Sequence, residues 1–267
     1  MKLRPRLYDI LRIFGVYKLY EKWLYHQINS NKKELPRHVG VILDGNRRWA
    51  TLHGLEKWVG HEKGAKKLRD LIKWSLEFNI KHLTVFVFST ENFKRPKEEV
   101  NKLMDILRHE LIKAVNDEDI IKNGIKVKFI GDISKFPNDI IKLIYELEEK
   151  TKNNSKLVVN IALGYGGKWD IVNATRKIAR DILHGKLMID DINYETYQKY
   201  LSTSHLPYQD VDLILRTGGE MRLSNFLLWQ AAYSELVFLD VYWPEFRKID
   251  YMRAIRTYQQ RNRRFGR

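Results

Sequence analysis

Short runs of β-branched and aliphatic residues alternate with longer stretches of helical periodicity along most of this chain. The short runs have the length of buried strands, and apolar residues recur at helical spacing between them. An order of strand, helix and strand is typical of βαβ units, which build a mainly parallel sheet covered by helices. We therefore expect a single-domain α/β fold with about six strands, at residues 39–43, 83–88, 126–130, 157–163, 212–215 and 236–239.

The stretches between these strands predict helices that flank the sheet. Each has apolar residues on one face and charged residues on the other, as a helix packed on a sheet requires. The predicted helices cover residues 62–78, 97–122, 138–152, 169–184, 224–233 and 251–263.

The N-terminal segment has a different pattern. Residues 1–34 predict an amphipathic helical extension, and residues 35–267 form the predicted main domain. Leu7, Leu11 and Phe14 fall near one helical face, with basic residues around them. Two interpretations stay open: an additional helix packed on the domain, or a helix lying on an anionic membrane surface.

The charge balance indicates anionic partners. Lys and Arg number 48 against 33 Asp and Glu, a formal net charge of +15. Such an excess attracts nucleic acid, acidic membrane surfaces or phosphorylated substrates, without choosing among them. The chain has no cysteine, which excludes thiol nucleophiles and Cys-ligated zinc. No run of about 18 apolar residues predicts a membrane span, so we expect a cytoplasmic protein, either free or peripheral at the membrane.

Four polar clusters directly follow predicted strands, at residues 44–48, 89–96, 164–170 and 216–224. The carboxyl ends of parallel strands meet at one edge of a sheet, where ligands of open α/β folds bind. The last cluster combines arginine forks with glycines that let backbone N–H groups approach an anion. It contains Arg216, Gly218, Gly219, Arg222 and Ser224, which together predict a phosphate site.

A second cationic group is predicted from Arg48, His61 and Arg95. Two sets of anion binders indicate two phosphorylated substrates, or one with several phosphates. Asp44 is a carboxylate among these cations. It could orient an arginine through a salt bridge, or bind Mg²⁺, which proteins hold with one or two carboxylates while waters and substrate phosphates complete the coordination. Glu235 is a candidate second carboxylate.

Several familiar motifs are missing from the sequence. It contains no G-x-x-x-x-G-K-[ST], no G-x-G-x-x-G after the first strand and no H-E-x-x-H. A D-D-x-x-D run is also missing. These absences count against P-loop nucleotide hydrolysis, metalloprotease chemistry and a paired-aspartate diphosphate clamp.

The four clusters together resemble one family, the cis-prenyltransferases, or Z-type polyprenyl diphosphate synthases, of the undecaprenyl diphosphate synthase type. The matching stretches are "HVGVILDGNRRWA", "GHEKGAKKL", "FSTENFKRP", "GYGGKWDI", "DLILRTGGEMRLSNFLLWQAAYSEL" and "RRFG". They extend from about residue 37 to residue 266 and occur in order. The style of the sequence is similar to the archaeal branch, whose members tend to use geranylgeranyl diphosphate.

The resemblance implies a Mg²⁺-dependent transferase that adds isopentenyl diphosphate to an allylic primer, farnesyl or geranylgeranyl diphosphate. The product would be a long-chain Z-polyprenyl diphosphate, the precursor of an undecaprenyl-type glycosyl carrier lipid. By the family pattern, Asp44 and Glu235 bind the metal, and Asp44, Ser89 and Asn92 act at the reacting atoms. The allylic diphosphate would contact Gly45, Asn46, Arg48, Lys57, His61 and Arg95, and isopentenyl diphosphate would contact Arg216, Arg222 and Ser224.

The resemblance also implies an apolar product tunnel between the sheet and the helices. A leucine at position 157, which aligns with the tunnel floor, indicates a medium-to-long product. Lys57 stands where many members have an arginine, and Arg47 replaces a small residue, so primer binding can differ. The candidate wall residues are Leu103, Met104, Leu107, Leu143, Leu147, Leu157 and Val159.

Family members end in R-x-G, here residues 264–266, which reaches toward the partner's site, so we expect a homodimer. Its interface would include Phe226, Leu227, Trp229 and Tyr233. A non-catalytic partner subunit of the same fold is the alternative, but such a chain is expected to lose Asp44 or the "DGNxR" cluster. We expect no nucleic-acid binding, because the distinctive cations lie at strand ends beside glycines rather than along one surface.

Overall fold

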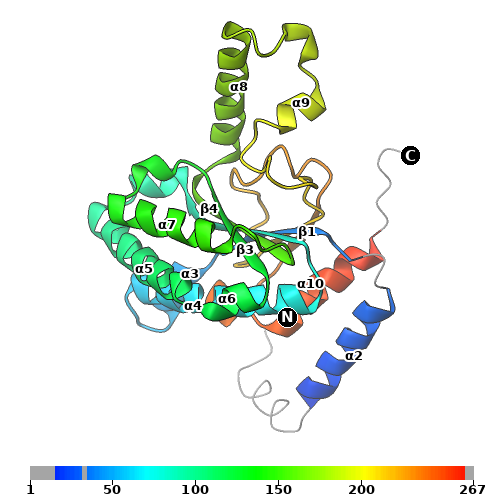
Figure 1. Cartoon of the computed structure of the whole chain (residues 1–267). Coiled ribbons are helices and arrows are strands. Elements are labelled where there is room, and N and C mark those ends of the chain that lie inside the picture. The colour runs from blue at the N-terminus through cyan, green and yellow to red at the C-terminus, as the bar shows by residue number, and fades with distance from the viewer. Residues whose placement is uncertain (1–15, 32–34, 262–267) are drawn as a thin grey trace.

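The computed structural model describes residues 16–31 and 35–261. Its centre is one sheet of six strands, all parallel, in the order β3-β4-β2-β1-β5-β6 (Figure 1). All six predicted strands are confirmed. They are β1 (His38–Ile42), β2 (His82–Ser89), β3 (Ile125–Ile130), β4 (Leu157–Tyr165), β5 (Leu213–Arg216) and β6 (Glu235–Phe238).

The strand order creates a topological switch point beside β1. From β1 the chain continues to β2 on one side, whereas β5 pairs with the other side of β1. The segments that follow β1 and β5 therefore diverge and leave a crevice at the carboxyl edge, the usual ligand position in open α/β sheets.

Helices and tight turns connect the strands. The α2–α10 helix pair and helices α4, α5 and α7 contribute to one hydrophobic core with the sheet, while α8 and α9 extend away from the sheet in Figure 1. The helices are α2 (Val16–Ser30), α3 (Asn46–Leu52), α4 (Lys57–Glu77), α5 (Lys97–Val115), α6 (Glu118–Lys122), α7 (Asn138–Thr151), α8 (Gly167–Leu183), α9 (Tyr194–Gln198) and α10 (Lys248–Gln260), with short 3₁₀ turns η2 (Thr90–Lys94), η3 (Ile133–Lys135), η4 (Ile189–Asp191) and η5 (Trp243–Glu245).

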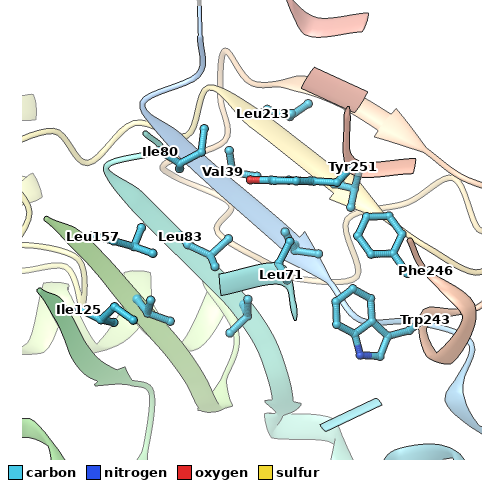
Figure 2. Packing of buried hydrophobic residues seen from close by; sticks show 14 of the residues in the cluster. Val39, Leu71, Ile80, Leu83, Ile125, Leu157, Leu213, Trp243, Phe246 and Tyr251 are labelled. Atoms are coloured by element: carbon cyan, nitrogen blue, oxygen red, sulfur yellow. The ribbon is translucent and has the colours of Figure 1, made fainter. Parts of the chain in front are cut away.

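The two faces of the sheet are both buried, which explains the continuous apolar runs of its strands. Leu213 and Leu215 of β5 belong to the main core, whereas Ile214 belongs to a second cluster on the opposite face. Figure 2 shows the main core, where side chains of neighbouring strands pack against Trp243 and Tyr251. Alternation within each strand therefore joins two cores through one sheet.

Two predicted helices differ in the structure. Residues 97–122 form two helices, α5 and α6, because Asp117 begins a new helix and accepts a hydrogen bond from the N–H of Asp119. The helix predicted over residues 224–233 was wrong. That segment consists of turns, with positive φ at Ser224, Asn225 and Leu227, a conformation that a regular helix cannot contain.

The N-terminal extension packs on the domain where it is described. Helix α2 lies against α10, and its Leu24 and Ile28 are fully buried in the main core. The Gln259 side chain donates to the carbonyl of Ile28 over 3.1 Å. Leu19 and Trp23 of α2 remain partly exposed to solvent. The first half of the predicted extension, residues 1–15, lies outside the described residues.

Three buried polar side chains form a hydrogen-bonded network across β1, β2 and β4, near the amino ends of these strands. His38 of β1 is fully buried, and its Nε2 lies 2.7 Å from the hydroxyl of Thr84 on β2. The Asn160 amide of β4 donates to the same hydroxyl over 3.0 Å. Burial, together with the neighbouring His82, lowers the pKa of His38 to about 3. His38 is therefore neutral in the folded protein at neutral pH.

This burial predicts an acid-dependent loss of stability. Between pH 6.5 and about 3, His38 is protonated in the unfolded chain but stays neutral in the folded protein. The free energy of unfolding should thus decrease as pH falls through that window, by up to about 1.4 kcal/mol per pH unit from this group. Urea denaturation between pH 7 and pH 4 should give a shallower decrease for His38→Gln. Equal slopes for the two proteins would contradict the prediction.

Candidate active site

Asp44 lies in the crevice at the carboxyl end of β1 and contacts β5 directly. Its carboxylate accepts from Arg216 Nη2 over 2.8 Å and from the N–H of Gly45 over 2.6 Å. Its backbone N–H and carbonyl both hydrogen bond the Thr217 hydroxyl, at 3.0 and 2.7 Å. The side chain is 28% exposed. Both proposed roles of Asp44 thus remain compatible with the geometry, since it orients an arginine and faces the crevice.

Arg216 ends β5 and is almost completely buried. Besides Asp44, its guanidinium donates to the Ser224 hydroxyl over 2.8 Å and to the carbonyl of Arg222. A buried arginine with these fixed partners is held in one orientation, so little ordering remains to be done when an anion binds.

The glycines beside Arg216 are required by their conformation and by space. Gly218 has φ +88°, and a Cβ at this position would lie 2.7 Å from Arg48 Nη2 and 3.2 Å from the carbonyl carbon of Asp44. Gly219 has φ +76°, where a Cβ would lie 3.1 Å from an Asp240 carboxylate oxygen. Gly218 therefore lets the arginine of one strand end approach the backbone of the other.

Arg48 stands between the two predicted anion sites. Its guanidinium lies 3.3 Å from Asp44 and donates to Glu220 over 3.3 Å, above the ring of Tyr242. The second oxygen of Glu220 accepts from Arg222 over 2.6 Å. Glu220 thus links a residue predicted for the allylic diphosphate with one predicted for isopentenyl diphosphate.

Asn46 begins α3 and His61 lies in α4, and the two helices pack closely here. A Cβ on Gly60 would lie 2.1 Å from the carbonyl oxygen of Asn46, and one on Gly64 would lie 2.3 Å from its side-chain oxygen. The buried atoms Asn46 Oδ1 and His61 Nε2 have no hydrogen-bond partner among the described residues. Buried polar atoms are normally paired, so these two unpaired atoms are unusual, and both residues line the cavity described below.

His61 corrects one detail of the predicted cationic group. Burial lowers the pKa of His61 to about 4, and the positive charges of Arg95 and Arg47 act in the same direction. The imidazole is therefore neutral at neutral pH and can serve as a hydrogen-bonding group, whereas the charge of the cluster comes from arginine.

Arg95 and Lys57 complete the cationic wall. Arg95 donates to Glu99 over 3.0 Å, and Glu99 also lies 3.7 Å from Arg47. Burial lowers the pKa of Arg95 from its ordinary value, and Glu99 offsets part of that effect. Lys57 begins α4 and is exposed to solvent. Two arginines sharing one carboxylate leave net positive charge available for a ligand.

Ser89 and Asn92 lie where β2 ends in an irregularity. The register of β2 against β4 shifts on either side of Phe88, so Val87 is left out of the pairing and is 37% exposed. Such bulges redirect side chains next to active sites. Asn92 then accepts from the N–H of Ser89 over 2.9 Å, as part of a capping box that begins η2.

A cavity of about 810 Å³ connects these groups. One part is polar and contains the residues described above. The other part is apolar and passes between the sheet and helices α4 and α5. Of the predicted site residues, those that line the cavity are Asp44, Gly45, Asn46, Arg48, Lys57, His61, Ser89, Asn92, Arg95, Arg216 and Ser224, joined in the apolar part by Phe86, Val87, Phe88, Leu103, Ile106, Leu107 and Leu163.

Arg222 and Glu235 are placed elsewhere. Arg222 is exposed and reaches the site through Glu220 and through its own carbonyl. Glu235 is the first residue of β6, level with Leu213 at the amino end of β5, and it pairs with Arg261 over 2.9 Å. Within one chain the structure does not bring Glu235 to Asp44, because the two lie at opposite edges of a parallel sheet.

Several other predictions can be compared with the structure. Leu103 and Leu107 line the cavity, whereas Leu157 and Val159 are fully buried in the main core. Phe226, predicted at a dimer interface, is instead buried within its own chain, as is Leu227. The continuous product tunnel stays a prediction.

Glu220, Thr217, Glu99 and Tyr242 were not predicted as parts of the site. Glu220 and Thr217 lie inside the quoted "RTGGE" stretch. Arginines that lie close together require a carboxylate partner, which could have indicated Glu220. Tyr242 follows β6 without any motif. Its ring packs against Gly45, where a Cβ would lie 2.6 Å from Tyr242 Cδ1.

The fold and site define a parallel α/β protein whose arginine-rich crevice at the sheet edge opens into an apolar cavity. Comparison with known proteins gives the family. Residues 42–266 match the Prenyltransf family model, described as "Putative undecaprenyl diphosphate synthase". The chain belongs to this family of cis-prenyltransferases, and like its relatives it is a transferase of prenyl groups.

Two curated relatives are archaeal and carry the same name, tritrans,polycis-undecaprenyl-diphosphate synthase (geranylgeranyl-diphosphate specific). The protein of Methanocaldococcus jannaschii is 46% identical over 97% of this chain and 92% of its own length. That of Picrophilus torridus is 50% identical over 94% of this chain and 97% of its own length. The predicted archaeal character is thereby confirmed.

A solved structure shows the same architecture. Lavandulyl diphosphate synthase from Lavandula x intermedia, crystallised with dimethylallyl diphosphate, has a TM-score of 0.85 and 36% identity to this chain. The similarity covers 88% of this chain and 100% of that one. The predicted fold class and enzyme class are both confirmed.

Gly218 gives a direct test of the anion site. Gly218→Ala should push the Arg48 guanidinium away from the crevice, because the added Cβ would lie 2.7 Å from Nη2. Gly219→Ala is the matched control, since it introduces similar backbone strain at φ +76° without touching Arg48. Both should lose about 1–2 kcal/mol of stability. In calorimetric titration with inorganic pyrophosphate, only Gly218→Ala should bind at least about tenfold more weakly; equal affinities would contradict this assignment.

Proposed function

We propose that this protein catalyses the Mg²⁺-dependent addition of isopentenyl diphosphate units to an allylic diphosphate primer, forming a long-chain Z-polyprenyl diphosphate. The observation that carries the proposal is the meeting of two arginine groups at Asp44, directly above an apolar cavity. The relatives named above are geranylgeranyl-diphosphate specific. Geranylgeranyl diphosphate is therefore the proposed primer, and an undecaprenyl-type carrier-lipid precursor is the proposed product.

The allylic diphosphate is assigned to the group around β1. The Gly45 N–H donates a hydrogen bond to the Asp44 carboxylate, and the Arg48 guanidinium forms an ion pair with it, so both groups already bind an anion. His61 supplies a neutral nitrogen that has no partner among the described residues. Arg95 adds charge from η2's end, and the prenyl tail would then extend into the apolar part of the cavity.

Isopentenyl diphosphate is assigned to the group after β5. Arg216 donates a hydrogen bond to the Ser224 hydroxyl over 2.8 Å, and both residues line the cavity. Arg222 is exposed and linked to Glu220, so its approach to a diphosphate requires a rotation of its side chain. The two diphosphates would lie on either side of Asp44.

A magnesium ion fits the donor set at Asp44. The carboxylate faces the cavity, and its present partners are two arginines and one N–H that a diphosphate can equally accept from. Mg²⁺ is commonly held by one carboxylate together with substrate phosphates and waters. When bound, the ion would neutralise negative charge that develops on the departing pyrophosphate. The predicted contribution of Glu235 would require it to come from the other subunit of a dimer.

The chain's own residues would then divide the reaction between them. The bond between C1 of the primer and its diphosphate oxygen breaks, and its electron pair leaves with the pyrophosphate. The double bond of isopentenyl diphosphate forms the new carbon–carbon bond at C1, and a proton passes from C2 of the added unit to the departing pyrophosphate. Arg48 and Arg95 stabilise the departing charge, while Ser89 and Asn92, fixed by their capping box, face the cavity where the proton is removed.

Two further properties belong to this proposal. The protein is expected to act as a homodimer and to associate peripherally with the membrane that receives its lipid product. The exposed pair Leu19 and Trp23 on α2, with Arg256 packed over the Trp23 ring at 4.6 Å, supports a membrane-facing role for this helix. No helix among residues 16–31 and 35–261 is both long and apolar enough to cross a bilayer.

The function is tested by incorporation of labelled isopentenyl diphosphate with Mg²⁺ and detergent present. Dimethylallyl, geranyl, farnesyl and geranylgeranyl diphosphates are offered separately, and the products are sized by chromatography. We expect incorporation to be fastest with geranylgeranyl diphosphate and to stop when EDTA is added. Absence of incorporation with every primer would overturn the proposal and favour a non-catalytic partner subunit.

Asp44→Asn should reduce turnover by at least about 10²–10³-fold, because an amide neither attracts a metal nor balances the arginines in the transition state. The fold should survive, since an amide oxygen can still accept from Arg216. Asp139→Asn, which changes an exposed carboxylate on α7, is the matched control and should keep the full rate. Near-normal turnover by Asp44→Asn would show that the carboxylate has no catalytic role.

A further inference from the structure

The apolar part of the cavity ends at a charged pair on its two helical walls. On α5 the lining residues are Leu103, Ile106, Leu107 and Glu110, which recur at i, i+3, i+4 and i+7 and so share one face. The helix rises about 1.5 Å per residue, which puts Glu110 about 20 Å from Lys97, the first residue of α5. A carboxylate thus follows three aliphatic side chains on the same wall.

Glu110 is held across to the other helical wall. Arg69 of α4 donates to one of its carboxylate oxygens over 3.3 Å, and Lys113 donates to the other over 3.0 Å. Arg69 lies one turn beyond Ala65, which also lines the cavity. The Arg69 side chain is 44% exposed and that of Glu110 is 21% exposed. The ion pair therefore lies at the boundary between the cavity and solvent, in the gap between α4 and α5.

The cavity is large enough for the primer but too small for the product. A dry engineered cavity of about 150 Å³ holds benzene, which corresponds to about 25 Å³ per carbon atom. At that density the 810 Å³ cavity holds about 32 non-hydrogen atoms. Geranylgeranyl diphosphate has about 29, whereas an undecaprenyl diphosphate has about 64 and would occupy about 1,600 Å³. The product therefore needs space beyond the present walls of the cavity, which either their displacement or an exit for the chain could provide.

We propose that the growing chain leaves between α4 and α5 by displacing the Arg69–Glu110 ion pair, and that this pair helps to set product length. The inference rests on the proposed function, because it takes the product to be a long prenyl chain. A partly exposed ion pair contributes little stability and opens at small cost. Both side chains can turn their charged ends to water while their aliphatic stems line the passage.

The absence of cysteine from the sequence allows a clean closure experiment. Arg69→Cys/Glu110→Cys is joined by a cleavable bis-maleimide, which ties α4 to α5 at the end of the cavity. Arg108→Cys/Asp139→Cys is the matched control. It replaces another ion pair of α5, this time with α7, and neither residue lines the cavity.

With geranylgeranyl diphosphate as primer, the cross-linked 69/110 enzyme should stop after the first few additions, and cleavage of the linker should restore long products. The cross-linked 108/139 enzyme should make products of the wild-type length. Full-length products from the cross-linked 69/110 enzyme would overturn the proposal. Failure of the unmodified enzyme to incorporate isopentenyl diphosphate would instead overturn the proposed function.

Glu110→Ala gives an independent measurement without a cross-link. Removing the carboxylate frees Arg69 and opens the boundary, so the product distribution should move to longer chains by one or more isoprene units. Glu110→Gln keeps the size of the side chain and should give an intermediate shift. An unchanged distribution in Glu110→Ala, even if the cross-linked enzyme loses all activity, would overturn the proposal.

Discussion

The ion pair between Asp44 and Arg216 joins the ends of β1 and β5, and the rest of the site depends on it. These two strands are neighbours in the sheet although 172 residues separate the paired side chains. The pair is stable only because each charge has further partners: Gly45 N–H and Arg48 for Asp44, and Ser224 for Arg216. A buried arginine without such partners would carry a large desolvation cost.

The same interaction supports the proposed binding of substrate phosphates. One carboxylate faces two arginines, so positive charge is in excess before any ligand arrives. A diphosphate can accept from both guanidinium groups in place of the carboxylate, and the carboxylate then becomes available to a divalent cation. Glu99 and Glu220 act in a similar way on neighbouring arginines, since each is shared between two of them. Preorganised cations of this kind stabilise a leaving pyrophosphate without having to be gathered during the reaction.

Much of this organisation could be predicted from the sequence. The strands were recognisable because both faces of the sheet are buried, so each strand is a continuous aliphatic run bounded by turns. The polar clusters after β1, β2 and β5 do converge, since parallel strands end at one edge. The motif resemblance identified the family, and the match of residues 42–266 to the family model confirms it.

Other features could not be read from local patterns. Residues 224–233 have helical periodicity, but the site requires left-handed backbone at Ser224 and Asn225, and tertiary contacts decide that conformation. Glu235 precedes a strand rather than following one, which places it at the wrong edge for Asp44. The neutral state of His61 comes from burial and from the arginines around it, which only the assembled site supplies. The Arg69–Glu110 pair depends on how α4 and α5 meet.

The most direct test of the central claim is a crystal structure with Mg²⁺, isopentenyl diphosphate and a non-reactive thiolo analogue of geranylgeranyl diphosphate. We predict the allylic diphosphate on Gly45 N–H and Arg48, isopentenyl diphosphate on Arg216 and Ser224, and the metal bound between Asp44 and a diphosphate. The prenyl tail should extend along Leu103 and Leu107. Diphosphates bound away from this crevice, with the Asp44–Arg216 pair unchanged and the cavity without the tail, would contradict the account.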